Sequence, residues 1–289
     1  YIQSSASYND ITPIRSTTAA GDVTFGATDG SSSINVTDTA HGAAKGDFVT
    51  FSGAVSLGGN IVADVLNQEY EIDSITSTSV YVITAKDTSG ATVTANSSDS
   101  GNGGSSTVGA YQINVGRWGT TEAITSGWGA DAWGSGTWGS SSSLSSLNQL
   151  RLWSMDGFGE DLIANVRAGG IYYWDTSAKT LGTDRAVNIS ELSGANFTPT
   201  IALQVLVSDI DRHVIALGAD PINDSATART GFSDPLLVAF SDQENPAEWF
   251  PTSTNTAGSL RCSAGSHIIG GLRARQETLI WTDVALYSL

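Results

Sequence analysis

Three carboxylates lie close together between residues 156 and 161, and their residue types are those of a glycoside hydrolase. Asp156, Glu160 and Asp161 could supply the acid and its partner carboxylate. That chemistry needs two carboxyl groups about 5 to 10 Å apart across a cleft. The pair Asp156-Gly157 is also a hairpin signal, because Asp-Gly suits a two-residue turn. We therefore expect turn carboxylates here and no enzyme.

The other potential ligands do not form a metal-binding pattern. The three histidines are dispersed among apolar segments: His41, His213 and His267. The single cysteine, Cys262, can complete neither a zinc cluster nor an internal disulfide, so a buried thiol is expected. The pair Asp209 and Asp211 lacks the glycine and distal glutamate of an EF-hand loop. We predict no catalytic, cofactor or metal site.

The charge balance is strongly acidic. Thirteen Lys and Arg stand against 29 Asp and Glu, which gives a formal net charge of -16 and argues against a sequence-reading DNA-binding protein. Five arginines are spread along the chain and are expected to pair with carboxylates at turns or subunit contacts: Arg117, Arg151, Arg167, Arg273 and Arg275.

The elements that position these residues are predicted to be strands. The chain has 32 glycines and only 15% charged residues, and no window has sustained helical periodicity. Residues 150–175 fit three short strands joined by glycine turns. Apolar runs that end in an acidic residue recur at Ile171–Asp175, Leu236–Asp242 and Leu279–Asp283. Repeated small sheets are typical of a β-propeller, and about four blade-like groups can be counted.

Continuous apolar runs of strand length predict buried strands after residue 150. They are Ile201–Val207, His213–Leu217, Leu236–Phe240, His267–Leu272 and Thr278–Trp281.

A separate β-domain is predicted between residues 16 and 110, where the composition shifts to Ser, Thr, Gly and Asp. Its strands are expected at Ser33–Val36, Asp47–Phe51, Glu69–Ile75, Ser79–Thr84 and Ala91–Ala95, spaced as in a small sandwich or barrel. Residues 99–106 are expected to be a loop or exit linker. The predicted organisation is therefore propeller strands in 1–15, an inserted β-domain in 16–110, a connecting segment in 111–149 and propeller blades in 150–289.

The connecting segment contains four tryptophans that are each followed by glycine: Trp118, Trp128, Trp133 and Trp138. A stiff aromatic side chain beside a glycine suits a close contact between chains. The same rings could instead cap the domain's own core, or form a platform on which sugars stack.

No apolar run approaches the roughly 18 residues of a membrane span, so no membrane span is expected. The chain begins at Tyr1 and stops at Leu289 directly after a strand-like run, and both ends suggest a fragment.

Several segments together resemble one family of virion proteins. They are Tyr8–Arg15, Asp38–Ala43, Gly46–Gly53, the Trp-Gly segment, Leu152–Ser154, Phe158–Leu162, Asp211–Gly218, Phe240–Pro246 and Arg275–Asp283. This set is similar to the tail nozzle, or DNA-stabilisation (tail tubular), proteins of short-tailed bacteriophages.

The resemblance implies a propeller-bearing structural subunit of the virion tail. Such a subunit forms a homo-oligomeric ring, a hexamer in relatives, that contacts tail adaptor proteins and tail fibres or spikes. It retains packaged genomic DNA and conducts it during ejection, without sequence-specific binding and without a cofactor. Part of the acidic excess is then expected to face the channel. The alternative is a receptor- or glycan-binding propeller at the tail tip.

Overall fold

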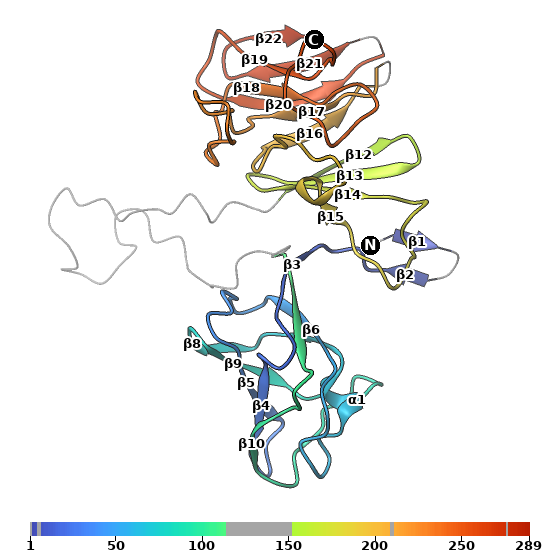
Figure 1. The fold of residues 1–289 in the computed structure, drawn as a ribbon, viewed down its shortest axis with the longest axis vertical. Coiled ribbons are helices and arrows are strands. Elements are labelled where there is room, and N and C mark those ends of the chain that lie inside the picture. Colours follow the sequence, from blue (N-terminus) through green and yellow to red (C-terminus); the bar gives the residue numbers. More distant parts are fainter. Residues whose placement is uncertain (1, 5–6, 114–151, 209–210, 276) are drawn as a thin grey trace, which may run out of the picture. The chain divides into compact units, whose positions relative to one another are not determined.

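The computed structural model describes residues 2–4, 7–113, 152–208, 211–275 and 277–289. The fold is all-β, as predicted: antiparallel sheets account for the regular structure, and the described helices are the four-residue α1 (Ala63–Leu66) and the three-residue 3-10 helix η2 (Ile189–Glu191). The chain divides into two compact units (Figure 1). We call residues Ile14–Leu150 the inserted unit, and Tyr1–Pro13 with Arg151–Leu289 the stacked unit.

The inserted unit contains two sheets that share one core. The five-stranded sheet has the order β10 (Asp99–Asn102), β4 (Thr24–Ala27), β5 (Ser33–Thr37), β9 (Val80–Thr84), β8 (Ser74–Ser77). The four-stranded sheet has the order β3 (Ile14–Thr17), β11 (Val108–Gln112), β6 (Phe48–Ser52), β7 (Glu69–Glu71). Alternate residues point inward, as in β5, where Ile34 and Val36 are buried between exposed neighbours. Because side chains of both sheets meet in this core, the unit is a β-sandwich.

Three details of the inserted unit differ from the sequence prediction. Residues 91–95 form only a single bridge, Lys86 to Thr92, and not a strand. Residues 99–102 are not a linker, because β10 pairs with β4 through a bulge. The run Glu69–Ile75 is divided between β7 and β8, which belong to different sheets. At residues 99–106, a composition rich in Gly, Ser and Asp suggested a loop, but the edge pairing of β10 with β4 overrides this weak local preference.

The stacked unit begins with a hairpin of β1 (Ile2–Ser4) and β2 (Ser7–Asn9) and continues after residue 151 with three antiparallel sheets. Sheet I contains β12 (Trp153–Phe158), β13 (Asp161–Val166), β14 (Ile171–Trp174) and β15 (Val187–Asn188). Sheet II contains β16 (Gln204–Val207), β17 (Val214–Leu217), β18 (Leu237–Phe240) and β19 (Gly258–Arg261). Sheet III contains β20 (Ile268–Arg273), β21 (Thr278–Thr282) and β22 (Leu286–Ser288).

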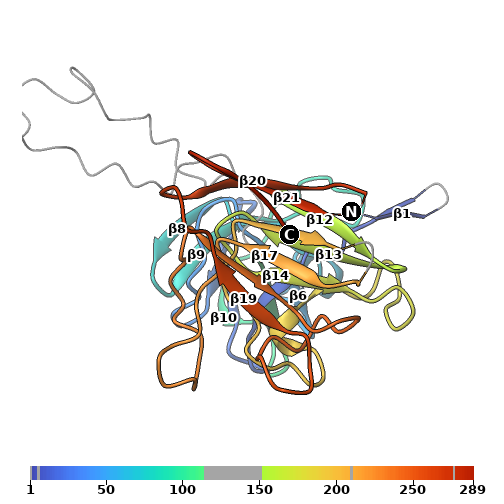
Figure 2. The same cartoon turned by 90° about the horizontal axis from the view of Figure 1, so that it is seen from above.

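Sheet II lies between sheets I and III, and the three sheets overlap when viewed along the stack (Figure 2). In β17, Val214 and Ala216 pack in the core shared with sheet I, whereas Ile215 and Leu217 pack in the core shared with sheet III. Both faces of this sheet are covered at β17 and β18, which explains why these strands are continuous apolar runs, whereas β19 is a largely exposed edge strand. The prediction of buried strands after residue 150 is confirmed for sheet II.

Two predictions for the stacked unit need correction. The described residues form three sheets rather than about four groups, because the runs at 201–207, 213–217 and 236–240 all belong to sheet II. The turn between β12 and β13 is Gly159-Glu160 and not Asp156-Gly157, which lies inside β12. Gly159 has a φ of +70°. This positive value suits glycine at the first central position of a two-residue hairpin loop.

Candidate functional site

The first strands of the three sheets, β12, β16 and β20, lie next to one another in sequence order. Each is an edge strand, so its outward backbone groups need hydrogen-bond partners outside its own sheet. Polar side chains of the neighbouring sheet supply these partners. On β16, the Val205 N–H donates to the Ser154 hydroxyl oxygen at 2.9 Å. We call this set of side-chain-to-edge contacts the sheet junction.

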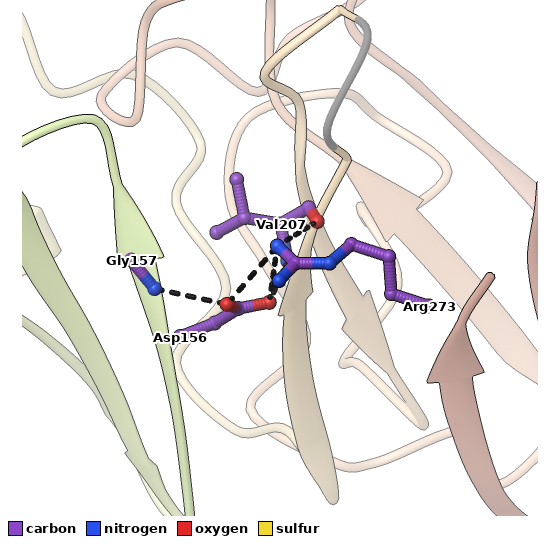
Figure 3. A network of polar contacts seen from close by, with 4 residues as sticks. All are labelled: Asp156, Gly157, Val207 and Arg273. Carbon is purple, nitrogen blue, oxygen red and sulfur yellow. Dashed lines mark hydrogen bonds and ion pairs between the residues drawn. The ribbon is translucent and has the colours of Figure 1, made fainter. Parts of the chain in front are cut away.

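Asp156 is the charged centre of the sheet junction (Figure 3). Its Oδ2 accepts the Val207 N–H at 2.9 Å, and its Oδ1 accepts the Gly157 N–H at 2.9 Å. The Arg273 guanidinium from the end of β20 lies 3.2 Å from Asp156 Oδ1 and donates to the Val207 carbonyl at 3.3 Å. The side chains of Arg273 and Asp156 are 35% and 15% exposed. One ion pair therefore connects all three sheets.

Gln204 joins sheet II to sheet III by a two-sided amide contact. Its Nε2 donates to the Gly271 carbonyl at 2.9 Å, and its Oε1 accepts the Gly271 N–H at 2.8 Å. The side chain thus continues the hydrogen-bond pattern of a sheet across the gap between two edge strands. Asn165 has a similar role between sheets I and II, because its Nδ2 lies 3.3 Å from the Ala202 carbonyl.

Two hollows adjoin Arg273. One has a volume of about 250 Å³ and is lined by Ser208, Asp211, His213, Phe240, Arg275 and Glu277, among others. The other, of about 340 Å³, is lined by Asp156, Gly159, Val207, Ser208 and Arg212, among others. Side chains of both charges line the first hollow.

Among the residues that line the first hollow, His213 is of the type that most often acts as a general acid or base. Its Nδ1 is 2.7 Å from the Ser241 carbonyl oxygen, which can only accept, so Nδ1 carries the proton. Its ring also meets Phe240 edge to face, with centroids 6.0 Å apart. The imidazole is thereby fixed in orientation by β17 and β18 and supports the wall of the hollow.

Two of the predicted carboxylates, those of Asp156 and Asp161, are engaged in structural contacts. Asp156 belongs to the sheet junction, while the Asp161 carboxylate accepts the Tyr173 hydroxyl and, at 2.8 Å, the Thr176 N–H. Burial and the Asp161 carboxylate raise the pKa of Tyr173 above its ordinary value. The Glu160 carbonyl oxygen accepts the Thr176 hydroxyl at 2.8 Å. These contacts fix the two hairpins of sheet I.

The other predicted residues are scattered over the fold. His41 lies in the inserted unit, where its Nε2 donates to the Ser77 carbonyl at 3.2 Å. His267 lies beside Ser266 at the start of β20. Cys262 is buried, as expected, and burial raises the pKa of its thiol. Arg273 is paired with a carboxylate, as expected.

Some of the predicted residues fall outside the described part of the chain. The four Trp-Gly pairs, Arg117, Arg151 and Asp209 are among them. Within the described ranges, no group of three or more His, Cys, Asp or Glu side chains could hold a metal ion. Over the same residues, no helix is long and apolar enough to cross a membrane.

Sequence reasoning missed one buried polar centre. Asp220 is fully buried, and its carboxylate accepts the Thr200 hydroxyl at 2.6 Å and the Gly231 N–H at 3.2 Å. The Arg229 side chain donates to the Asp220 carbonyl at 2.6 Å, and burial lowers the pKa of that guanidinium. The signal in the sequence is an Asp-Pro pair after an apolar strand, which is common at ordinary turns.

Comparisons with known proteins give little further information. No protein-family model matches the chain, and no curated protein matches it. Among solved structures, the chain is similar to the phage phi92 endosialidase, with 13% sequence identity and a TM-score of 0.29. The match covers 93% of this chain and 35% of that one, so the chain spans about a third of the length of that structure.

Proposed function

We propose that this chain is a structural protein of a short-tailed phage tail, and that it forms part of a ring-shaped nozzle that retains packaged DNA and conducts it during ejection. The resemblance of its long segments to the nozzle family motivates the proposal. The fold is compatible with it, because small antiparallel sheets in series are the building units of a propeller.

The sheet junction is the observation that supports a structural role best. Asp156 and Arg273 connect sheets I, II and III. The sequence suggested Asp156 as a candidate for catalysis and Arg273 as a candidate for charge pairing. Gln204 and Ser154 serve the same purpose through neutral contacts. These contacts hold the first strands side by side and oppose sliding of one sheet over another. A conduit that must keep its shape under internal pressure needs such stiffness.

Three of the segments that carry the resemblance lie in the framework of the stacked unit. Asp211–Gly218 includes β17, Phe240–Pro246 follows β18 into the turn bridged by Asp242 and Asn245, and Arg275–Asp283 includes β21. They provide strands and the turns that end them. These three segments therefore contribute to the architecture of the sheets, as a structural role requires.

The location and the role in DNA retention can be tested in phage particles that contain the protein. Gold-labelled antibody against the purified chain should mark the tail below the head. Particles produced without the protein should lose DNA, measured as the fraction of genome that an added nuclease digests. Label on the head, or unchanged nuclease protection, would refute the proposal.

The same purified chain should be incubated with bacterial surface polysaccharides. The nozzle proposal expects neither retention on immobilised glycan nor release of shorter chains. Specific retention would favour the receptor-binding alternative, and shortened products would show a depolymerising enzyme.

A further inference from the structure

The 340 Å³ hollow beside the sheet junction is lined by a large share of positive charge. It is bordered by the end of β12 and its turn, the end of β16, the loop before β17 and the end of β20. Only 13 of the 289 residues are Lys or Arg, yet two of the seven described lining residues are arginines, Arg212 and Arg273. Among the described residues of the lining, Asp156 is the only carboxylate. We call this space the arginine hollow.

The negative charge of Asp156 is held by the sheet junction (Figure 3). Its two oxygens accept the N–H groups of Gly157 and Val207 and face the Arg273 guanidinium, and the side chain is only 15% exposed. The contacts of Arg273 to Asp156 and to the Val207 carbonyl are all made through Nη1. This ion pair balances Arg273 and leaves Arg212 as the second positive charge of the lining.

Arg212 reaches over the turn between β12 and β13. A Cβ atom at Gly159 would lie 3.8 Å from Arg212 Nη1, so the guanidinium lies beside a residue that has no side chain. Arg212 Nη1 is also 3.8 Å from Glu244 Oε1, which is beyond hydrogen-bond distance, and the two side chains are 54% and 67% exposed. Water screens such a pair, so Glu244 holds the guanidinium only weakly.

The backbone of Arg212 is fixed in a left-handed conformation. Its φ is +49° and that of Glu244 is +54°, in a region that residues other than glycine rarely adopt. The Arg212 N–H donates to the Ser208 carbonyl at 3.1 Å, and the Glu244 N–H donates to the Arg212 carbonyl at 3.3 Å. Backbone outliers of this kind cluster at ligand-binding and active sites, where the surrounding structure must maintain them. The loop therefore presents Arg212 with a fixed backbone and a loosely held side chain.

Two guanidinium groups at one hollow suit an oxyanion. A guanidinium is always charged, and it donates parallel hydrogen bonds to a phosphate or a carboxylate. Ser208 lines the same hollow and has a hydroxyl group that can donate a further hydrogen bond. A volume of about 340 Å³ is at the lower end of the range of ligand pockets, about 300 to 1,000 Å³. A hollow of this size has room for a phosphate group and part of the molecule that carries it.

We propose that the arginine hollow binds a phosphate group. Arg212 turns from Glu244 to the phosphate, and Arg273 donates from the sheet junction while it stays paired with Asp156. A phosphate suits two guanidinium groups better than a carboxylate does, because it has more acceptor oxygens and, at a terminal position, a second negative charge. The group belongs either to a small molecule with a terminal phosphate or to a DNA backbone. This site does not depend on the nozzle proposal, since a conduit needs no phosphate site.

Binding to the purified 289-residue chain is measured by calorimetry and phosphorus NMR. The ligands are inorganic phosphate, acetate and a short DNA duplex without terminal phosphates. The test variant is Arg212→Gln, which removes a charge from an exposed side chain and leaves the sheet junction intact. The matched control is Arg261→Gln, which removes one charge from an arginine–carboxylate pair outside the hollow, where the arginine side chain is 59% exposed. Circular dichroism shows whether each variant is folded.

Inorganic phosphate should bind one-to-one with a Kd on the order of 1 mM, at least about tenfold more weakly in Arg212→Gln and within about twofold of the wild type in Arg261→Gln. Equal weakening by both variants would show a general effect of net charge and overturn the inference. So would acetate that binds as tightly as phosphate, or the absence of saturable binding for both phosphate and duplex. Duplex binding that depends on Arg212 in the same way identifies a backbone phosphate as the source, and phosphate binding without it identifies a small molecule.

A second variant acts in the opposite direction. Glu244→Gln removes the carboxylate that competes for Arg212, so the affinity for phosphate should rise by about threefold. Asp224→Asn removes one negative charge from an exposed residue of the same unit and should change the affinity less. If both variants raise the affinity equally, the role assigned to Arg212 is wrong.

Discussion

Replacing Asp156 with alanine should destabilise the stacked unit more than an ordinary surface change. The substitution removes the acceptor of the Val207 N–H, whose residue is buried at the edge of β16. Leaving a buried donor unsatisfied costs about 1 to 3 kcal/mol. Loss of the Arg273 ion pair adds only about 0.2 to 1 kcal/mol, because the guanidinium is 35% exposed and largely screened by water.

The expected total is about 1 to 4 kcal/mol, which at about 3 °C per kcal/mol corresponds to a fall in melting temperature of about 3 to 12 °C for a domain of this size. Calorimetry and urea unfolding of the 289-residue chain measure both quantities. Asp156→Asn keeps an acceptor for the Val207 N–H and should cost about 1 kcal/mol or less. Asp224→Ala, at an exposed carboxylate of the same unit, is the matched control.

A double-mutant cycle separates the two contributions. Combining Asp156→Ala with Arg273→Ala should give a coupling free energy of about 1 kcal/mol or less, since most of the loss belongs to the Val207 N–H. If Asp156→Ala lowers stability no more than Asp224→Ala does, the carboxylate does not hold the sheets together. A coupling above about 2 kcal/mol would show that the ion pair is the main contribution.

Two further substitutions test the packing, and a change of pH tests the turns. Gly271→Val places side-chain atoms where Leu206 and Leu217 already lie, so the free energy of unfolding should fall by about 1 to 3 kcal/mol, and a fall under 0.5 kcal/mol would contradict the close approach. Among the described residues, Trp249 is the largest fully buried side chain, so Trp249→Ala should cost about 3 to 5 kcal/mol in urea unfolding. The Thr256 N–H lowers the pKa of Asp242 below 3.8, and the Arg261 guanidinium outweighs burial to lower that of Asp234. Their stabilisation should be complete above about pH 5 and lost as the pH falls through the lowered folded pKa, so unfolding free energies that do not change between pH 5 and pH 2.5 would refute it.

The sequence predicted β16, β17 and β18 of sheet II well, because the two central strands are buried on both faces, whereas it did not reveal the edge strands β15 and β19. A strand buried on both sides needs a continuous apolar run, and such runs stand out from a Ser- and Gly-rich background. The edge strands of the sheets were harder to predict from the sequence. Strand β10 has the sequence Asp-Ser-Gly-Asn and owes its structure to pairing with β4, which no local pattern reveals.

The polar contacts of the site could be predicted only in part. Paired arginines were expected, and Arg273 is paired, but its partner lies 117 residues earlier in the chain. Asp156 was interpreted as a turn residue because Asp-Gly is a strong hairpin signal. In the structure Gly159 takes the positive φ, and Asp156 remains in the strand, where it can meet β16. Sequence spacing within one hairpin carries no information about contacts between sheets.

The acidic excess has a local structural explanation that also bears on a channel for DNA. Carboxylates accept backbone N–H groups at several turns, among them Asp87 at Ala91, Asp175 at Ala178 and Asp283 at Ser266. Hydrogen bonds from the Ser89 hydroxyl to Asp87, from the Ala178 N–H to Asp175 and from the Ser266 hydroxyl to Asp283 are the largest causes of a lowered pKa, and the other backbone N–H contacts add to them. The negative charge is therefore fixed at the ends of strands and persists in mild acid. Repulsion of phosphates extends about 8 Å at physiological salt, so in the proposed nozzle any of these turns that border a narrow passage would keep a DNA backbone from adhering to its wall.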